Sequence, residues 1–290
     1  MIKAEGRLTI RRAVPEDAET CGQICFDAFS TINQAHNFPC DFPGPEVTTG
    51  VLSMMFSAPD FYCVVAESEG CVVGSNCLDE RSVIAGVGPI TVDPRVQSAG
   101  IGRALMLAVM ERAKERRAAG VRLVQAAFHN RSLSLYTNLG FDVQEPLACM
   151  QGRTQQLSVA GCTVRTATTA DVDACKALSH RVHGFERGTE LERAIQAGTA
   201  KVVERGGRIT GYATGLAFFA HATAETNPDL KALIASAESF GGSGILVPTR
   251  NSDLFRWCLA NCLRVVQPMT LMSMGLYNQP AGAFLPSVSF

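Results

Sequence analysis

The chain has 290 residues, of which 47% are hydrophobic and 18% charged, and its formal net charge is −1. This composition is ample for two buried cores and excludes a largely disordered protein. A net charge near zero provides no global field toward nucleic acid or an anionic membrane, and we expect neither as a partner.

Two parts of the chain show the same series of predicted elements. An edge strand, a turn and an acidic helix start are predicted over residues 8–17 and again over 162–171. A hairpin of two apolar strands around a glycine-containing turn follows at 62–75 and at 200–212. We interpret this repetition as an internal duplication.

The duplication predicts two domains, 1–150 and 162–290, joined by a junction at 151–161. The junction consists mainly of small and polar residues, which are typical of a domain boundary. It is too short to be a long linker, so we expect the two halves to pack closely.

The most informative stretch of the first half covers residues 87–103. An apolar segment ends at Asp93-Pro94, and the loop sequence Gln-Ser-Ala-Gly-Ile-Gly leads into an amphipathic helix predicted over 103–117. Glycines let the backbone come close to a ligand, while N–H groups and the positive helix end face an anion. The pattern therefore predicts a pyrophosphate site.

Several features of this half together resemble the cofactor-binding core of the GNAT N-acetyltransferases, which bind acetyl-CoA. Gln97-Ser-Ala-Gly-Ile-Gly matches the family signature Gln/Arg-x-x-Gly-x-Gly/Ala, and Ile90-Thr-Val-Asp-Pro resembles the fourth strand, whose end splays from its neighbour. A strand predicted over 121–128 is followed by Asn130 and Tyr136 at the spacing of the family. The resemblance implies an α/β (α+β) fold of two tandem GNAT-like domains, each a mixed, mostly antiparallel twisted sheet flanked by helices.

The resemblance also implies how acetyl-CoA, the acyl donor, binds to the first half. Backbone amides of the glycine loop would hold the pyrophosphate, and the pantetheine would add to the strand edge at 90–92 as a further strand does. An amide near Val92 would polarise the thioester carbonyl, and Asn130 would contact CoA from the opposite side. The expected cofactor-binding residues are Ile90, Val92, Gln97, Ser98, Ala99, Gly100, Ile101, Gly102, Arg103 and Asn130.

The resemblance identifies Tyr136 as the candidate acid, since a phenol can protonate the departing CoA thiolate. The alternative is a tyrosine that only packs its ring in the core. The general base stays open: Glu80, at the end of a strand, is the first choice. His36 and Asp41 in a loop, or the terminal carboxylate of Phe290, are the other candidates.

The second half differs where the cofactor would lie. After a strand predicted over 217–224, the sequence from Glu225 begins a helix with Asn227 as N-cap and Pro228 at the first helical position. Paired glycines are absent, and two carboxylates would repel phosphates. Trp257 occupies the position that corresponds to the candidate acid. We therefore expect the second half to be a degenerate copy without cofactor.

The chain has eleven cysteines, no C-x-x-C pair and no apolar run of the secretory type at its start. We expect a cytoplasmic protein with free, mostly buried thiols. The pairs Cys21/Cys25 and Cys258/Cys262 lack the further ligands that a metal site needs, so we expect no metal.

Other histidines and cysteines are expected to be structural. His180 and His183 share a helix face without a carboxylate, and we interpret them as surface residues. Cys63, Cys71 and Cys77 lie on predicted strands with no histidine nearby in the sequence to activate a thiol. A covalent cysteine intermediate is therefore not expected.

We expect an acyl-CoA-dependent N-acetyltransferase that moves an acetyl group to a primary amine of a small or amino acid-like molecule by direct attack. A non-catalytic acyl-CoA sensor and a protein acetyltransferase for lysine or N-terminal amines are the alternatives. The loop lacks the glycine spacing of a dinucleotide-binding oxidoreductase. The sequence leaves the acceptor, the acyl preference and a homodimer open.

Overall fold

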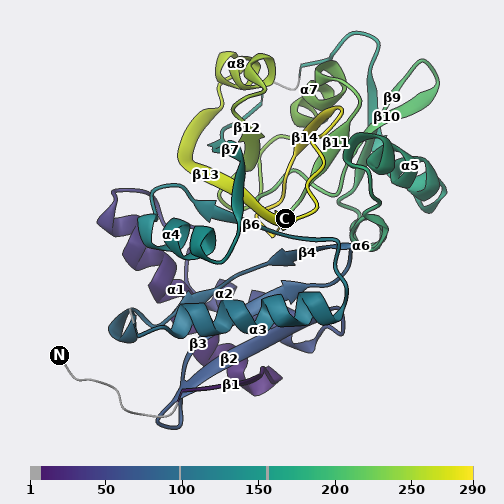
Figure 1. Cartoon of the computed structure of the whole chain (residues 1–290). Helices are drawn as coiled ribbons and strands as arrows, with labels where there is room; N and C mark the ends of the chain where they lie inside the picture. Colours follow the sequence, from purple (N-terminus) through teal and green to yellow (C-terminus); the bar gives the residue numbers. More distant parts are fainter. Residues whose placement is uncertain (1–7, 98, 155–156, 290) are drawn as a thin grey trace. The chain divides into compact units, whose positions relative to one another are not determined.

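The computed structural model describes residues 8–97, 99–154 and 157–289 (Figure 1). These residues form two compact units. The first unit contains the chain up to Leu123 together with Ser134–Leu139 and Ser289, and the second contains Val124–Leu133 and Gly140–Val288. Each unit is described by itself below.

The sheet of the first unit has the order β1-β2-β3-β4-β6, and β5 also pairs with β3. All pairs are antiparallel except β4 with β6, which is parallel. The elements are β1 (Thr9–Arg12), α1 (Ala18–Ala35), α2 (Pro45–Ser57), β2 (Phe61–Ser68), β3 (Cys71–Asp79), β4 (Ile84–Val87), β5 (Thr91–Val92), α3 (Ile101–Glu115), β6 (Gly120–Ala126) and α4 (Asn130–Asn138), with short 3-10 turns at Pro15–Asp17 and Pro94–Val96.

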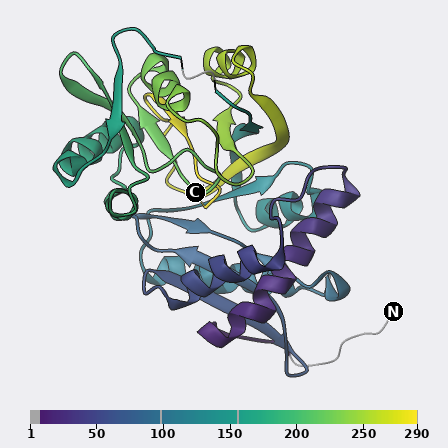
Figure 2. The same cartoon turned by 180° about the vertical axis from the view of Figure 1, so that it is seen from behind.

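Helices cover both faces of this sheet. Figure 1 shows α3 in front of β2 and β3, whereas Figure 2 shows α1 and α2 in front of the opposite face. Cys21 and Cys25 of α1 pack with Leu52 of α2 and with Cys63 and Cys77 of the strands in one buried cluster. The expected apolar face of α3 is confirmed in part, because Leu105, Val109 and Ala113 are buried while Ala108 is half-buried.

The second unit repeats this arrangement. One of its sheets has the order β14-β11-β10-β9-β8, and β7 pairs antiparallel with both β13 and β12. Helices α5 and α6 pack on one face of the first of these sheets. The elements are β7 (Asp142–Gln151), β8 (Thr163–Thr166), α5 (Val172–His183), α6 (Gly188–Gln196), β9 (Lys201–Arg205), β10 (Arg208–Ala213), β11 (Ala222–Ala224), α7 (Asn227–Ala235), β12 (Ile245–Pro248), α8 (Ser252–Ala260), β13 (Arg264–Gly275) and β14 (Ala283–Leu285), with a 3-10 turn at Thr169–Asp171.

One ion-pair motif occurs at the same place in each unit. In the first unit, the Arg11 guanidinium donates to Asp17 at 2.7 and 2.8 Å and to Glu67 at 2.9 Å. In the second unit, Arg165 donates to Asp171 at the same two distances, 2.7 and 2.8 Å. Its Nε donates to Glu204 at 2.9 Å. A three-residue arrangement repeated on equivalent strands supports the duplication inferred from the sequence.

Two details of the second half differ from the sequence prediction. The strand predicted over 217–224 is only Ala222–Ala224, and Ala217 instead forms an isolated bridge with Gly241. The N-cap of α7 is Thr226 rather than Asn227, because the Thr226 hydroxyl and Asp229 interact across the first turn.

The compact units also divide the chain elsewhere than at the junction 151–161. Strand β7 belongs to the second unit because it pairs along most of its length with β13. The boundaries 1–150 and 162–290 concern the duplicated halves of the sequence, and they stay a prediction.

Candidate functional site

Strands β4 and β5 lie one after the other along the same neighbour, β3. Leu78, near the end of β3, pairs with Val87, and Gly74, nearer the middle of β3, pairs with Val92. Gly74 is required there, because a Cβ on it would lie 2.6 Å from the Thr91 carbonyl oxygen. The parallel ladder between β4 and β6 covers three residue pairs, from Ile84 to Gly86, and includes no residue of β5.

In a β-strand, the backbone N–H and C=O groups of successive residues point alternately to the two edges, which fixes the direction of these groups in β5. The Asp93 N–H donates to the Val73 carbonyl of β3 at 2.9 Å, so the neighbouring Val92 N–H and C=O point away from β3. The Gln97 side chain reaches back to this edge and donates from Nε2 to the Val92 carbonyl at 3.2 Å. The outer edge of β5 therefore presents the Val92 amide, whereas its contact with a thioester stays a prediction.

The loop after β5 has its own ion pair. Asp93 is buried, and its carboxylate accepts from the Arg95 backbone N–H at 2.9 Å and from the Arg95 guanidinium at 2.6 Å. The Arg95 guanidinium lowers the pKa of Asp93, against the opposing effect of desolvation. Gly100 then adopts a left-handed conformation with φ of 81°, which a residue with a Cβ adopts only at a cost.

The helix α3 begins at a glycine. Gly100 is its N-cap and has no side chain with which to cap the helix, and the first turn contains no acidic residue. The first N–H groups of a helix have no partner within it, and the helix dipole places partial positive charge there. Ala99, Gly100 and Arg103 are exposed at this end, so the loop can take an anion such as a pyrophosphate.

Part of α4 packs beside this loop within the first unit. A Cβ on Gly102 would lie 3.6 Å from Leu135 of α4 and 3.8 Å from Val92 of β5. Tyr136 is the next residue of α4 and is 6% exposed. Burial raises the pKa of Tyr136 well above its usual value, so its phenol keeps the proton that a donor needs.

The remaining predicted cofactor residues lie as follows. Ile90 and Val92 are half-buried, Ile101 is buried in the first turn of α3, and Ser98 lies outside the described residues. Asn130 is exposed in the second unit, where it begins α4. The N-terminal turn of α4 is capped by a residue that the sequence interpretation missed: the Ser132 N–H donates to Nδ1 of His129 at 3.0 Å.

Glu80, the first-choice base of the sequence interpretation, is bound by two arginines. Its side chain is 6% exposed and accepts from Arg112 Nε at 2.7 Å, and Arg116 lies 3.4 Å away. Arg112 and Arg12 also stack on the Tyr62 ring, 5.1 and 4.2 Å from its centroid. Two guanidinium groups stabilise the charged carboxylate and occupy its oxygens, which suits a link between α3 and the sheet better than a base. We do not carry Glu80 forward as the base.

The other candidate bases lie between α1 and α2 or at the chain end. His36 is exposed and its Nδ1 lies 3.0 Å from the Ile32 carbonyl, while Asp41 accepts from the Asn33 amide at 3.1 Å. Phe290, with its carboxylate, lies outside the described residues.

All eleven cysteines are free thiols, seven of them buried. Burial raises the pKa of Cys21, Cys175 and Cys258 to about 12, which makes each a poor nucleophile near neutral pH. Within residues 8–97, 99–154 and 157–289, no group of three or more His, Cys, Asp or Glu side chains has the geometry of a metal site.

The equivalent region of the second unit is built differently. Glu225 is followed directly by Thr226, the N-cap of α7, so the six loop residues 94–99 have no counterpart. The fully buried Asp229 carboxylate sits in the first turn, where it accepts from Arg205 at 2.9 Å and from Thr210 at 2.7 Å. Desolvation raises the pKa of Asp229. The hydrogen bonds from Arg205, Thr226 and Thr210 together outweigh this effect, so the pKa of Asp229 is lowered overall.

The start of α7 is also joined to the start of α8. The amides of Asn227 and Asn251 bond reciprocally, at 3.0 and 2.7 Å, and Asn227 donates to Asp253 at 2.7 Å. The Asp229 carboxylate and the amide pair thus place polar side chains of the protein itself at the start of α7. That the second half holds no cofactor stays a prediction.

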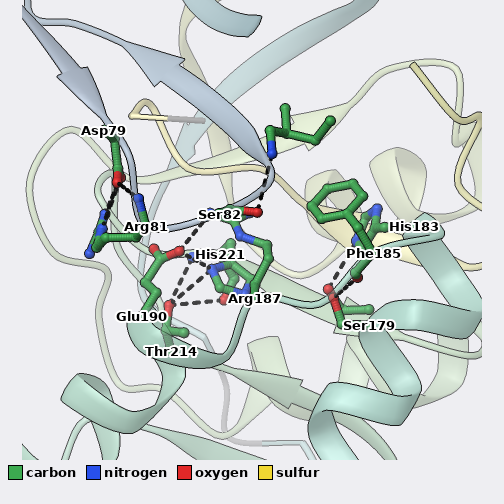
Figure 3. A network of polar contacts seen from close by, with 12 residues as sticks. Asp79, Arg81, Ser82, Ser179, His183, Phe185, Arg187, Glu190, Thr214 and His221 are labelled. Atoms are coloured by element: carbon green, nitrogen blue, oxygen red, sulfur yellow. Dashed lines mark hydrogen bonds and ion pairs between the residues drawn. The ribbon is translucent and has the colours of Figure 1, made fainter. Parts of the chain in front are cut away.

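The sequence interpretation missed a buried polar network in the second unit (Figure 3). His221 is 1% exposed, with Nδ1 3.3 Å from Glu190 and Nε2 3.1 Å from the Tyr212 hydroxyl. Arg187 donates to the same Glu190 oxygen at 2.6 Å. His183 was expected at the surface but is buried, because its Nε2 lies 3.0 Å from the Thr223 hydroxyl inside the core.

Residues 29–141 match the sequence profile of the Acetyltransferase (GNAT) family. A comparison with curated proteins gave no match. A provisionally assigned acetyltransferase from Pyrococcus horikoshii has a similar structure, with a TM-score of 0.72, 18% identity and coverage of 98% of this chain and 95% of that one. A GCN5-related N-acetyltransferase from Sphaerobacter thermophilus gives a TM-score of 0.63 at 16% identity, covering 94% of this chain and 98% of that one.

The fold is therefore the one seen in GNAT acetyltransferases, with mixed, mostly antiparallel sheets flanked by helices. Among the described residues, no helix is long and apolar enough to cross a membrane.

Proposed function

We propose that the protein is an N-acetyltransferase that uses acetyl-CoA as donor, bound once per chain, and a primary amine as acceptor. The observation that carries this proposal is the start of α3, with a glycine N-cap and no acidic residue in its first turn, in the same loop region as the outward-facing amide of Val92. Together these features offer two contacts that an acyl-CoA needs, an anion site and a strand edge.

The donor would bind through backbone groups. The pyrophosphate accepts hydrogen bonds from the amides between Gln97 and Arg103, where the open conformation of Gly100 lets it approach. The two amides of the pantetheine pair with the edge of β5 at Ile90–Val92. The Gln97 side chain fixes the loop against this edge through the Val92 carbonyl.

The chemistry is a direct transfer. A neutral amine attacks the thioester carbonyl, and the oxyanion that develops accepts a hydrogen bond from a backbone amide at Val92. The C–S bond then breaks, and the phenol of Tyr136 donates a proton or a hydrogen bond to the thiolate. The raised pKa of Tyr136 suits this role, because the group stays protonated across the neutral range.

A base must take the proton that the ammonium form of the acceptor loses. His36 and Asp41 are the described candidates, since the Glu80 carboxylate is already bound by two arginines. The Phe290 carboxylate is the third candidate. We favour a small or amino acid-like acceptor over a protein.

Calorimetric titration with acetyl-CoA tests donor binding. We expect one site per chain, and we expect G100L to abolish it because a leucine strains the backbone and blocks the anion. G70L is the matched control: Gly70 has a φ of 77° and open space around it, as Gly100 has, but lies in the β2–β3 turn. Equal loss of binding in both variants would mean that strain, not the loop, is responsible.

Turnover separates the enzyme from a sensor. Release of free CoA from acetyl-CoA, followed with a thiol reagent over a panel of small amines and lysine peptides, should rise with an amine. Binding of one acetyl-CoA without turnover on any acceptor would favour the sensor instead.

A further inference from the structure

The chain's own last strand occupies one edge of the second unit. Strand β14 pairs antiparallel with β11, with Ala283 opposite Ala224, Phe284 opposite Thr223 and Leu285 opposite Ala222. Figure 1 shows β14 in yellow beside β11. In the first unit the parallel strand β6 flanks β4, whereas in the second unit the corresponding β12 pairs with β7.

The edge that β14 covers corresponds to the edge of β5. Gly74 of β3 pairs with Val92, and Gly211 of β10 pairs with Ala224 in the same way. The next residue repeats the match: the Asp93 N–H donates to Val73, and the Glu225 N–H donates to Thr210 at 2.8 Å. Ala224 is therefore the counterpart of Val92.

The directions of the backbone groups agree as well. Because the Glu225 N–H points to β10, alternation turns the N–H and C=O of Ala224 away from β10 and toward β14. The Val92 amide has this same outward direction on β5. Strand β14 thus lies where an extended ligand of β5 would lie.

The fit of β14 is tight. Ala283 and Leu285 are 3% and 2% exposed and belong to the main core cluster of the unit. The Phe284 ring meets the ring of His183 edge to face, with centroids 5.7 Å apart. A Cβ on the preceding Gly282 would lie 2.4 Å from the Ala224 carbonyl oxygen, so the chain enters this edge in close contact with β11.

We propose that β14 is an intramolecular ligand that fills, on β11, the strand position that the acyl donor fills on β5. The second half is then closed by a segment of this chain, and an extended peptide with the sequence of residues 278–290 is the partner that the β11 edge recognises. The comparison with an acyl donor on β5 rests on the proposed function. The binding of β14 to β11 does not depend on it.

Hydrogen exchange of the intact protein tests whether β14 binds as a separable ligand. The amides of Ala222 and Ala224 face β14, whereas those of Thr223 and Glu225 face β10. We expect protection factors for Ala222, Ala224, Ala283 and Leu285 that agree with one another and are about tenfold or more below those of Thr223 and Glu225. Equal protection of both groups would make β14 an integral strand and overturn the proposal.

Binding in trans provides the second test. In the full-length L285D variant the buried carboxylate should release β14, and a labelled peptide of residues 278–290 should then bind, as followed by fluorescence anisotropy. The intact chain should not bind this peptide, nor should the variant bind a peptide with the same Leu285→Asp change. A variant that keeps its circular dichroism spectrum but binds no peptide would overturn the proposal.

Acetyl-CoA titrations of the same proteins separate the two proposals. One acetyl-CoA site in the intact chain supports the proposed function. If the intact chain has no such site, the proposed function is wrong, but the exchange and peptide results remain valid. We expect L285D to bind acetyl-CoA as the intact chain does, because Asp229 and the Asn227–Asn251 pair still occupy the start of α7.

Discussion

The starts of α3 and α7 differ although the strands before them correspond residue by residue. Before α3, six loop residues lead to Gly100, an N-cap that has no side chain of its own. Before α7, Glu225 leads directly to Thr226, and the Asp229 carboxylate lies in the first turn. The start of α7 contains an anion of its own, whereas the start of α3 contains no acidic residue and is the anion site that we propose.

If the two halves are duplicates, as we propose, this difference is what a half that has lost a ligand site and kept its fold would show. At the start of α7, a buried carboxylate with charge-assisted hydrogen bonds from side chains lies where the proposed site of the first unit would hold a phosphate. Strand β14 covers the edge of β11. Under this proposal each ligand group has a protein group of like chemistry in its place.

The largest effect is expected at Tyr136, the proposed acid. Y136F should lower kcat by about 10²-fold or more and leave the affinity for acetyl-CoA unchanged, because only the hydroxyl is lost. Steady-state kinetics and calorimetry measure the two quantities. W257F in the second half is the matched control and should leave kcat unchanged.

The pH profile gives an independent check on Tyr136. Because burial raises the pKa of Tyr136, the phenol stays protonated below its folded pKa, and it should cause no loss of kcat up to about pH 10. An alkaline loss centred below pH 10 that disappears in Y136F would contradict this assignment.

The next effect concerns stability and is expected at Asp229. D229N should lower the free energy of unfolding by about 2 kcal/mol at pH 7, because charge-assisted bonds from Arg205 and two threonines are weakened. The pKa of Asp229 is lowered in the folded protein, so its contribution is present above about pH 4 and is lost as the pH falls further. Urea unfolding at pH 7 and pH 3 measures this, and acetyl-CoA binding should not change.

D253N is the control for Asp229. The Asp253 side chain is 64% exposed and pairs with Lys231, so its loss should cost less than about 0.5 kcal/mol. A cost for D253N equal to that of D229N would mean that neither value reports the buried helix start.

The sequence predicted the first of these two helix starts because every part of it is local. The strand end, the glycine loop and the helix follow one another within residues 87–117, and the predicted helix 103–117 differs from α3 by two residues at each end. The repeated hairpins were likewise predictable, since a hairpin is made of neighbours in the chain.

What the sequence did not predict depends on contacts between distant residues. Glu80 meets Arg112 across 32 positions, and no local pattern distinguishes such a carboxylate from a base. His183 looked exposed because its partner Thr223 is 40 positions away. The pairing of β14 with β11 needs a register that the sequence does not specify.

The repeated ion-pair motif should give smaller effects of similar size in both units. D17N should lower the free energy of unfolding by about 1 kcal/mol, because the carboxylate binds its arginine through two hydrogen bonds, as Asp171 also does. Asp171 also accepts from the Thr168 hydroxyl at 2.9 Å, so D171N should cost about 0.5 kcal/mol more. Urea unfolding of both variants measures the difference.

T168V checks the origin of that difference, since Val14 stands at the corresponding position of the first unit. In the T168V background, the cost of D171N should fall to that of D17N. If the two costs still differ by the same amount, the hydroxyl is not the cause.

The smallest effect on catalysis is expected at Glu80. E80Q should leave kcat within about twofold, because the carboxylate is bound by Arg112 and Arg116, and lower the free energy of unfolding by about 1 kcal/mol. E115Q is the control, since the Glu115 side chain is 61% exposed and 3.7 Å from Arg112. A loss of kcat near 10²-fold with unchanged stability would return Glu80 to the role of base. It would also mean that the ion pair opens when the acceptor binds, and the comparison of the two halves would then have to include a movement of α3.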